Sequence, residues 1–177
     1  TSARIAQYNP AGKVPVLIDG DLRVWDSLAI CEYVSDQYLN GKGWPTDPAA
    51  RAEARACSAE MHSGFPAIRG QMPMNCRAKG RKVPLTSALE KEIARVDGLW
   101  SGYCEAHSSA GPWLFGDFSI ADCMFAPVAS RFETYGVSLS DAGKRYQQQL
   151  LNHPAMQLWI SQGQAETEVV EADEAGQ

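Results

Sequence analysis

The fold is decided by residues 14–27, which read VPVLIDGDLRVWDS. Residues 14–18 form an apolar, β-branched run, residues 19–21 form an Asp-Gly-Asp turn, and residues 22–25 return the chain. An Asp-Gly pair between two apolar segments is a strong local signal for a β-hairpin. We therefore expect two short antiparallel strands within residues 14–25.

The apolar period changes directly after this hairpin. From Ser27 onward, the apolar side chains fall at helical spacing, at Leu28, Cys31, Val34 and Tyr38. Asp26 or Ser27 can cap the new helix, because such side chains accept hydrogen bonds from the free N–H groups of a first turn. The decisive stretch thus predicts a hairpin followed at once by a capped helix.

The rest of the chain predicts helices separated by breakers. Residues 40–45 (NGKGWP) indicate a linker, and Asp47-Pro48 restarts a helix with Asp at the N-cap and Pro at the first helical position. Gly64 and Pro66 interrupt that helix. Later helix starts are expected at Thr86, at Ser119-Ile120-Ala121-Asp122, after Ser140 and at Pro154. The acidic tail from Glu166 is expected to fray.

Composition excludes several classes of function. The net charge of −5 and the pI near 5.2 argue against a nucleic-acid partner, which normally meets a basic face. No apolar run reaches the ~20 residues that a membrane-spanning helix needs. The five cysteines show no CxxC pair or metal-ligand spacing, so we expect no metal and unpaired thiols in a reducing cytoplasm.

Two short segments together suggest a ligand site. A proline at the start of a strand removes a ladder donor, and a cis Val14-Pro15 bond would leave the N–H and C=O of Val14 free to pair with a peptide-like ligand. Asp26 and Ser27 open a helix, where free N–H groups and the helix dipole favour a carboxylate, while Asp26 suits an ammonium group. The alternative for Asp26 and Ser27 is a helix cap without a ligand.

These segments resemble the glutathione transferase family. The matching pieces are Asn9-Pro10-x-Gly12-Lys13-Val14-Pro15-x-Leu17, Asp26-Ser27 opening a helix that includes Ile30 and Tyr33, and Phe118-Ser119-Ile120-Ala121-Asp122. The resemblance extends from about residue 8 to about residue 153. It rests on three motifs in the family's order and spacing, none of which is decisive alone.

The resemblance implies an α/β plus all-α fold. Residues 1–39 would be the C-terminal part of a thioredoxin-like glutathione-binding domain, residues 40–47 a linker, and residues 48–177 an all-helical C-terminal domain. A homodimer is also implied.

It also implies roles for five residues in binding glutathione. Val14 would pair with the cysteinyl backbone and Pro15 would be the cis proline. Asp26 and Ser27 would hold the γ-glutamyl end. Lys13 would meet the glycyl carboxylate, although a loop lysine is more often only solvated.

The chain departs from the family in one important respect. The family's catalytic Ser, Tyr or Cys lies near the end of a first strand, upstream of everything present here, so no residue can be assigned the thiol-activating role. A lone hairpin is marginally stable, and we expect an upstream strand–helix–strand unit to complete the sheet. Should that unit be dispensable, Cys31 and His62 become the first candidates for activating the thiol.

The leading functional hypothesis is an enzyme that binds glutathione and promotes attack of its thiol on a small hydrophobic electrophile. The alternatives are a non-catalytic glutathione-binding or protein-interaction scaffold of the same fold, and a glutathione-dependent peroxidase, isomerase or dehalogenase.

For several other residues, a functional role and a purely structural role are both considered. Ser119 and Asp122 favour helix capping over catalysis. His62 is an acid or base by residue type only. Four residues are candidates for an apolar co-substrate pocket, with core packing or a subunit contact as the alternative: Met61, Phe65, Met72 and Met74. Four basic residues indicate a solvated interhelical loop: Arg77, Lys79, Arg81 and Lys82.

Overall fold

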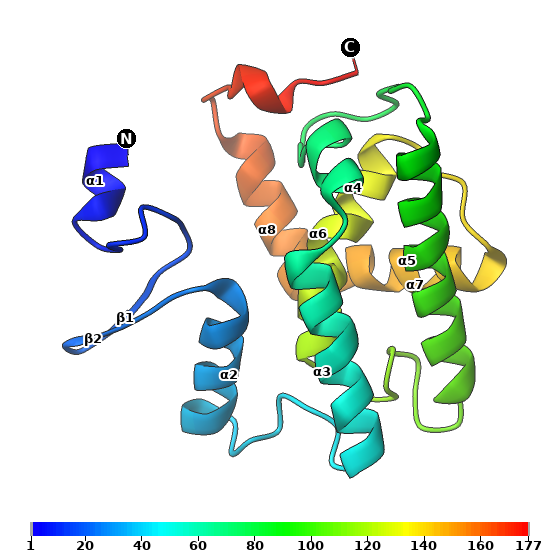
Figure 1. The fold of residues 1–177 in the computed structure, drawn as a ribbon, viewed down its shortest axis with the longest axis horizontal. Coiled ribbons are helices and arrows are strands. Elements are labelled where there is room, and N and C mark those ends of the chain that lie inside the picture. The colour runs from blue at the N-terminus through cyan, green and yellow to red at the C-terminus, as the bar shows by residue number, and fades with distance from the viewer. Residues whose placement is uncertain (1, 177) are drawn as a thin grey trace.

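The N-terminal part of the chain is a hairpin between a short and a longer helix. The structure, a computed structural model, describes residues 2–176. Its first elements are α1 (Ser2–Ala6), β1 (Leu17–Asp19), β2 (Leu22–Val24) and α2 (Ser27–Tyr38) (Figure 1). The strands pair antiparallel in the register Leu17↔Val24, Ile18↔Arg23 and Asp19↔Leu22. The predicted hairpin and helix are therefore present.

The first strand is shorter than expected. It begins at Leu17, so residues 14–16 of the predicted run precede the ladder. Pro15 has no N–H to donate, and a strand cannot extend through it as a regular ladder partner. Gly20 takes the left-handed conformation (φ +57°) that the tight turn after β1 requires.

The named elements of the second part of the chain are all helices. Its elements are α3 (Pro48–Ser63), α4 (Pro66–Gln71), α5 (Ser87–Ala106), α6 (Ile120–Thr134), α7 (Asp141–Asn152), α8 (Pro154–Ala165) and the 3₁₀-helix η1 (Glu171–Asp173). Helix α3 packs against α6, and α5 and α6 both pack against α7. The hairpin lies at one end of the molecule and this group of helices at the other (Figure 1).

Helix starts fall where the caps predicted them. The Asp47 carboxylate accepts a hydrogen bond from the Ala50 N–H at 2.8 Å, with Pro48 as the first residue of α3. Thr86 caps α5 by accepting from the N–H of Leu89. These starts could be predicted because a cap is a local arrangement, set by residues three positions apart.

The core lies between the helices of this second part. Trp100 of α5 is fully buried, and its ring contacts those of Phe125, Phe132 and Tyr146, with centroids 5.2–6.0 Å apart. These rings belong to three different helices, so they join α5, α6 and α7 into one unit.

Asp122 is a fully buried carboxylate at the start of α6. It completes the predicted capping box by accepting a hydrogen bond from the N–H of Ser119 at 2.8 Å. It also accepts from the hydroxyl of Tyr146 at 2.8 Å and from the N–H of Leu114 at 3.3 Å. Asp122 therefore fastens the loop before α6 to α7 as well as capping a helix.

The connection between α2 and α3 is held against α2 on one side and the start of α6 on the other. The N–H of Gly43 donates to the Ser35 hydroxyl at 3.0 Å, and its C=O accepts from the N–H of Ile120 at 2.8 Å. Trp44 is buried beside them, and its indole N–H donates to Glu32. A Cβ on Gly43 would lie 2.7 Å from Ser35 and 2.8 Å from Ile120, so only glycine fits.

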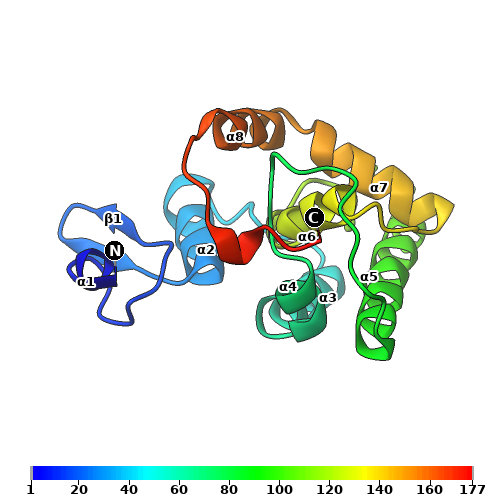
Figure 2. The same ribbon diagram turned by 90° about the horizontal axis from the view of Figure 1, so that it is seen from above.

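The acidic tail is not frayed in the structure. Residues 166–176 leave the end of α8, turn back over the helical part and form η1 on the way (Figures 1 and 2). The basic segment 77–82 that we expected to be solvated makes hydrogen bonds to this tail. Across residues 2–176, no helix is both long and apolar enough to cross a membrane.

Candidate functional site

A buried asparagine shapes the loop before the hairpin. Asn9 is almost fully buried, and its side-chain amide donates to the C=O of Lys13 at 2.7 Å. Its side-chain oxygen accepts from the N–H of Ala11, and its C=O accepts from Gly12, which has φ +65°. These bonds fix the turn that presents residues 13–15.

Val14 and Pro15 form an exposed edge. The Val14-Pro15 peptide bond is cis, as the sequence suggested. Val14 is 71% exposed, and no described group between residues 2 and 176 hydrogen-bonds to its N–H or C=O. This backbone pair is therefore available to an extended ligand, as an unpaired strand edge is.

Asp26 and Ser27 form the N-terminus of α2. One Asp26 carboxylate oxygen, Oδ1, accepts from the N–H groups of Leu28 and Ala29 at 3.1 and 3.3 Å, which makes Asp26 the N-cap. The Trp25-Asp26 peptide bond is also cis. Ser27 is half-buried, and its hydroxyl makes no hydrogen bond to any described residue. The Ser27 N–H also has no described partner, and a free N–H and hydroxyl at a helix start suit a carboxylate.

The hairpin brings these two segments to one end. Because β1 and β2 are antiparallel and Leu17 pairs with Val24, the residues before β1 lie beside those after β2. Lys13, Val14 and Pro15 precede Leu17 by two to four positions, and Asp26 and Ser27 follow Val24 by two and three. The five predicted residues therefore lie at the same end of the hairpin, and Lys13 among them is exposed.

His62 is the residue that the sequence did not connect to this surface. Its Nε2 lies 2.7 Å from Oδ2 of Asp26, the carboxylate oxygen that does not cap α2. His62 is 36 residues away, in the last turn of α3, so no local pattern could predict the contact. Both side chains are partly exposed, and the contact joins the helical part to the candidate site.

The surroundings of Asp26 favour its ionised form. Desolvation would raise the pKa of the carboxyl, but the hydrogen bond from the Ala29 N–H and the interaction with His62 together lower it below its usual value. Asp26 is therefore a carboxylate throughout the neutral range, as pairing with an ammonium group requires.

Asp19 and two tyrosines hold the hairpin against α2. The hydroxyl groups of Tyr33 and Tyr38 both donate to the same carboxylate oxygen of Asp19, the bond from Tyr33 being 2.8 Å long. This contact raises the pKa of Tyr33 to about 12. Tyr33 is therefore a structural hydroxyl and a poor source of phenolate.

The cysteines are not activated. All five are unpaired, and desolvation by the surrounding protein raises the pKa of each thiol above its usual value. Glu32 adds to the effect at Cys31, the thiol nearest in sequence to the site. Reactive cysteines have lowered pKa values, so Cys31 does not fit that role. Among residues 2–176, no group of three or more His, Cys, Asp or Glu side chains is arranged to hold a metal ion.

The predicted apolar pocket is not formed by the four residues proposed for it. Met61, Phe65 and Met72 are buried in the core, so the packing alternative holds for them. Met74 instead lines a groove of about 290 Å³ between α6 and α8. Its other walls are mainly apolar and include Phe118, Pro127, Met156 and Trp159.

Comparisons with known proteins agree with this geometry. The family described as glutathione S-transferase, N-terminal domain, matches residues 2–36. The chain is 26% identical over 145 residues to a stringent starvation protein A homolog from Pasteurella multocida, covering 81% of this chain and 64% of that protein. It is 28% identical over 153 residues to glutathione S-transferase GstB of Escherichia coli K12, covering 84% and 73%. The chain thus spans less than two thirds of the Pasteurella protein.

Solved structures show the same fold. A glutathione transferase homolog from Burkholderia gl BGR1, with bound glutathione, superposes with a TM-score of 0.63 at 26% identity, covering 90% of this chain and 78% of that one. The thioredoxin-like hairpin and helix joined to an all-helical part are the fold that this chain shares with that protein. The chain is thus similar to glutathione transferases in sequence and in fold, and its residues 2–36 match the N-terminal domain of that family.

Proposed function

We propose that the chain binds glutathione on the surface formed by Lys13, Val14, Pro15, Asp26 and Ser27. The N–H and C=O of Val14 pair with the cysteinyl backbone, beside the cis Pro15. The N–H and hydroxyl of Ser27 hold the γ-glutamyl carboxylate, Asp26 holds its ammonium group, and Lys13 meets the glycyl carboxylate.

One observation carries this proposal. The unpaired backbone of Val14 and the start of α2 lie at the same end of the hairpin, and the N–H and hydroxyl of Ser27 at that helix start bond to no described residue. Helix capping alone explains the position of Asp26. It does not explain why the Ser27 hydroxyl and the exposed Val14 backbone, which take no part in the cap, lie close to it.

For activity, we propose that the protein promotes attack of the bound glutathione thiol on a small hydrophobic electrophile. The nucleophile is the thiolate, so catalysis requires a group that lowers the pKa of the thiol. We assign that group to no residue of this chain. We further propose a thioredoxin-like domain at residues 1–39, a linker at 40–47 and an all-helical domain at 48–177, in a cytoplasmic homodimer. The five unpaired cysteines fit a reducing compartment.

The second candidate function is a non-catalytic glutathione-binding scaffold. It requires only the glutathione-binding surface and no group that lowers the pKa of the bound thiol. Turnover of a generic aromatic electrophile by the glutathione-bound protein, above the uncatalysed rate, would decide for the enzyme. Glutathione binding without turnover of the electrophile would support the scaffold.

Calorimetry with glutathione tests the binding site. Asp26→Ala combined with Ser27→Ala should weaken binding by about 3 kcal/mol, because hydrogen bonds to charged groups are lost. Asp26→Asn keeps an acceptor for the cap while removing the charge, and should cause about half of that loss. Asp36→Ala removes an exposed carboxylate from the same helix and serves as the matched control. Unchanged affinity in the double variant would refute the assignment.

A further inference from the structure

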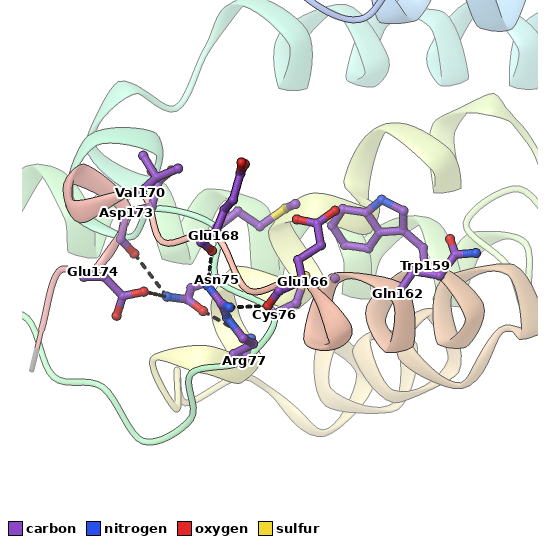
Figure 3. Close-up of a pocket in the computed structure, with 12 residues that line it drawn as sticks. Asn75, Cys76, Arg77, Trp159, Gln162, Glu166, Glu168, Val170, Asp173 and Glu174 are labelled. Atoms are coloured by element: carbon purple, nitrogen blue, oxygen red, sulfur yellow. Dashed lines mark hydrogen bonds between the residues drawn. The ribbon is translucent and has the colours of Figure 1, made fainter. Parts of the chain in front are cut away.

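Two hollows in the helical part differ in whether their polar groups already have partners. Beneath the C-terminal tail, the side chains of Asn75 and Arg77 donate hydrogen bonds to residues 166–174, so the main donors of that hollow are already used (Figure 3). A larger hollow, of about 460 Å³, lies between the linker at residues 42–47 and the loop at residues 107–119 that follows α5. It shares no lining residue with the surface proposed for glutathione.

The linker forms one wall of this larger hollow and is held in place by its own hydrogen bonds. Trp44 is buried, and its indole N–H donates to Glu32 at 2.8 Å. The guanidinium of Arg51 donates to the C=O groups of Pro45 and Thr46 at 3.2 and 3.0 Å. Because these bonds fix the linker without a ligand, binding at this wall costs little ordering of the chain.

The opposite wall carries aromatic rings whose positions are set by other contacts. Phe115 is buried and packs against Tyr103, with the ring centroids 4.7 Å apart. Phe118 is 41% exposed, and its ring stacks on that of His153 with an angle of 9° between the two planes. Both phenylalanines line the hollow, so they offer a preformed apolar surface to a flat ligand.

The polar side chains of the hollow are largely unused. Lys42, His107 and Asp117 make no side-chain hydrogen bond or ion pair to any residue between 2 and 176. Asp47 uses one carboxylate oxygen, Oδ2, to cap α3, and its Oδ1 has no described partner. Binding sites for small molecules combine apolar walls with a few polar groups of this kind. The two carboxylates outnumber Lys42, the permanent cation among the lining residues, so the hollow favours a positively charged ligand.

We propose that this hollow binds a small aromatic amine, meaning a flat aromatic ring that bears one cationic amino group. The ring lies against Phe115, Phe118 and Trp44, and the amino group faces the carboxylates of Asp117 and Asp47. Asp117 lies between the two phenylalanines in the same loop, so the ring and the amino group need be only a few bonds apart. This site does not depend on the binding of glutathione.

The test follows 2-phenylethylamine by NMR, using the whole chain labelled with nitrogen-15. The indole N–H of Trp44 gives its own cross-peak, which a Trp44→Phe variant assigns. We expect this cross-peak to shift saturably with a Kd of about 1 mM, as suits so small a ligand. The acid 3-phenylpropionate, with the same ring and the opposite charge, should bind at least about fivefold more weakly. Saturating glutathione should leave the Kd for 2-phenylethylamine unchanged, so the result is independent of the glutathione site.

The charges of the hollow are tested with matched variants. Asp117→Asn should weaken binding of 2-phenylethylamine about fivefold, whereas Asp141→Asn, in the exposed first turn of α7, should leave the Kd unchanged. Lys42→Gln removes the like charge and should tighten binding about twofold. The proposal would be overturned by the absence of a saturable shift at Trp44, by equal binding of the amine and the acid, by equal losses at Asp117 and Asp141, or by weaker binding in Lys42→Gln.

Discussion

Asp19 shows how single side chains hold the hairpin to its helix. The hydrogen bonds from Tyr38 and Tyr33 lower the pKa of this carboxyl. We expect Tyr33→Phe with Tyr38→Phe to move the pKa of Asp19 back up toward its usual value, as measured by carboxyl-carbon NMR titration. An unchanged Asp19 pKa would mean that the two hydroxyls do not reach it in solution.

The same pair of substitutions has a predictable pH dependence. A carboxyl whose folded pKa is lowered contributes stability above its unfolded pKa, near 3.9, and loses it as the pH falls through the folded value. The difference in melting temperature between the natural protein and the double Phe variant should therefore be largest at neutral pH. It should shrink below about pH 4, and a difference that is constant from pH 7 to pH 3 would contradict this origin.

The contact between His62 and Asp26 gives a further prediction for one residue. His62 helps to lower the pKa of Asp26, by its charge and by its hydrogen bond. His62→Ala should therefore raise the pKa of Asp26, and the rise should appear in the NMR titration of that carboxyl. Arg55→Ala, which removes a charge from the same helix that pairs with Glu32 and not with Asp26, is the control. Equal shifts in both variants would exclude a specific contact.

At the level of elements, α6 depends on Asp122 more than a cap alone requires. Loss of an N-cap costs about 1 kcal/mol, but Asp122→Ala would also leave the Tyr146 hydroxyl and the Leu114 N–H buried without an acceptor. We expect a total loss near 3 kcal/mol in urea unfolding. Asp141→Ala, in the exposed first turn of α7, should cost under about 1 kcal/mol. Similar losses in the free energy of unfolding in the two variants would show that Asp122 contributes no more than an ordinary helix cap.

Elements with local signals could be predicted from the sequence. Asp47-Pro48, Thr86 and the box from Ser119 to Asp122 each place a helix start within three residues of its cause. The hairpin was predicted for the same reason, although Pro15 shortened its first strand.

The features that could not be predicted depend on distant partners. His62 meets Asp26 across 36 residues, and Arg81 meets Glu174 across 93. A basic loop and an acidic tail each look solvated when taken separately, and only the path of the chain brings them together. The burial of Met61 and Met72 likewise follows from how the helices pack, which residue type alone does not reveal.

For the whole molecule, stability should be distributed unevenly. The two-stranded hairpin has few covering side chains, with Val14, Ile18 and Leu22 exposed, whereas α5, α6 and α7 share the Trp100 core. Isolated hairpins are marginal, and poorly covered segments open locally at low free energy. In hydrogen-exchange mass spectrometry, amides of residues 17–24 should exchange orders of magnitude faster than those of α6. Equal protection in both regions would contradict this distribution.

Gly43 limits how this protein can exchange parts with its relatives. Its backbone is bonded to Ser35 on one side and to Ile120 on the other, with no room for a side chain between them. A chimera that takes residues 1–39 from a related protein would carry that protein's residue at position 35. It would keep Gly43 and Ile120 from this chain. Such a chimera should tolerate wide sequence change elsewhere in the first segment. These three positions have to be inherited together.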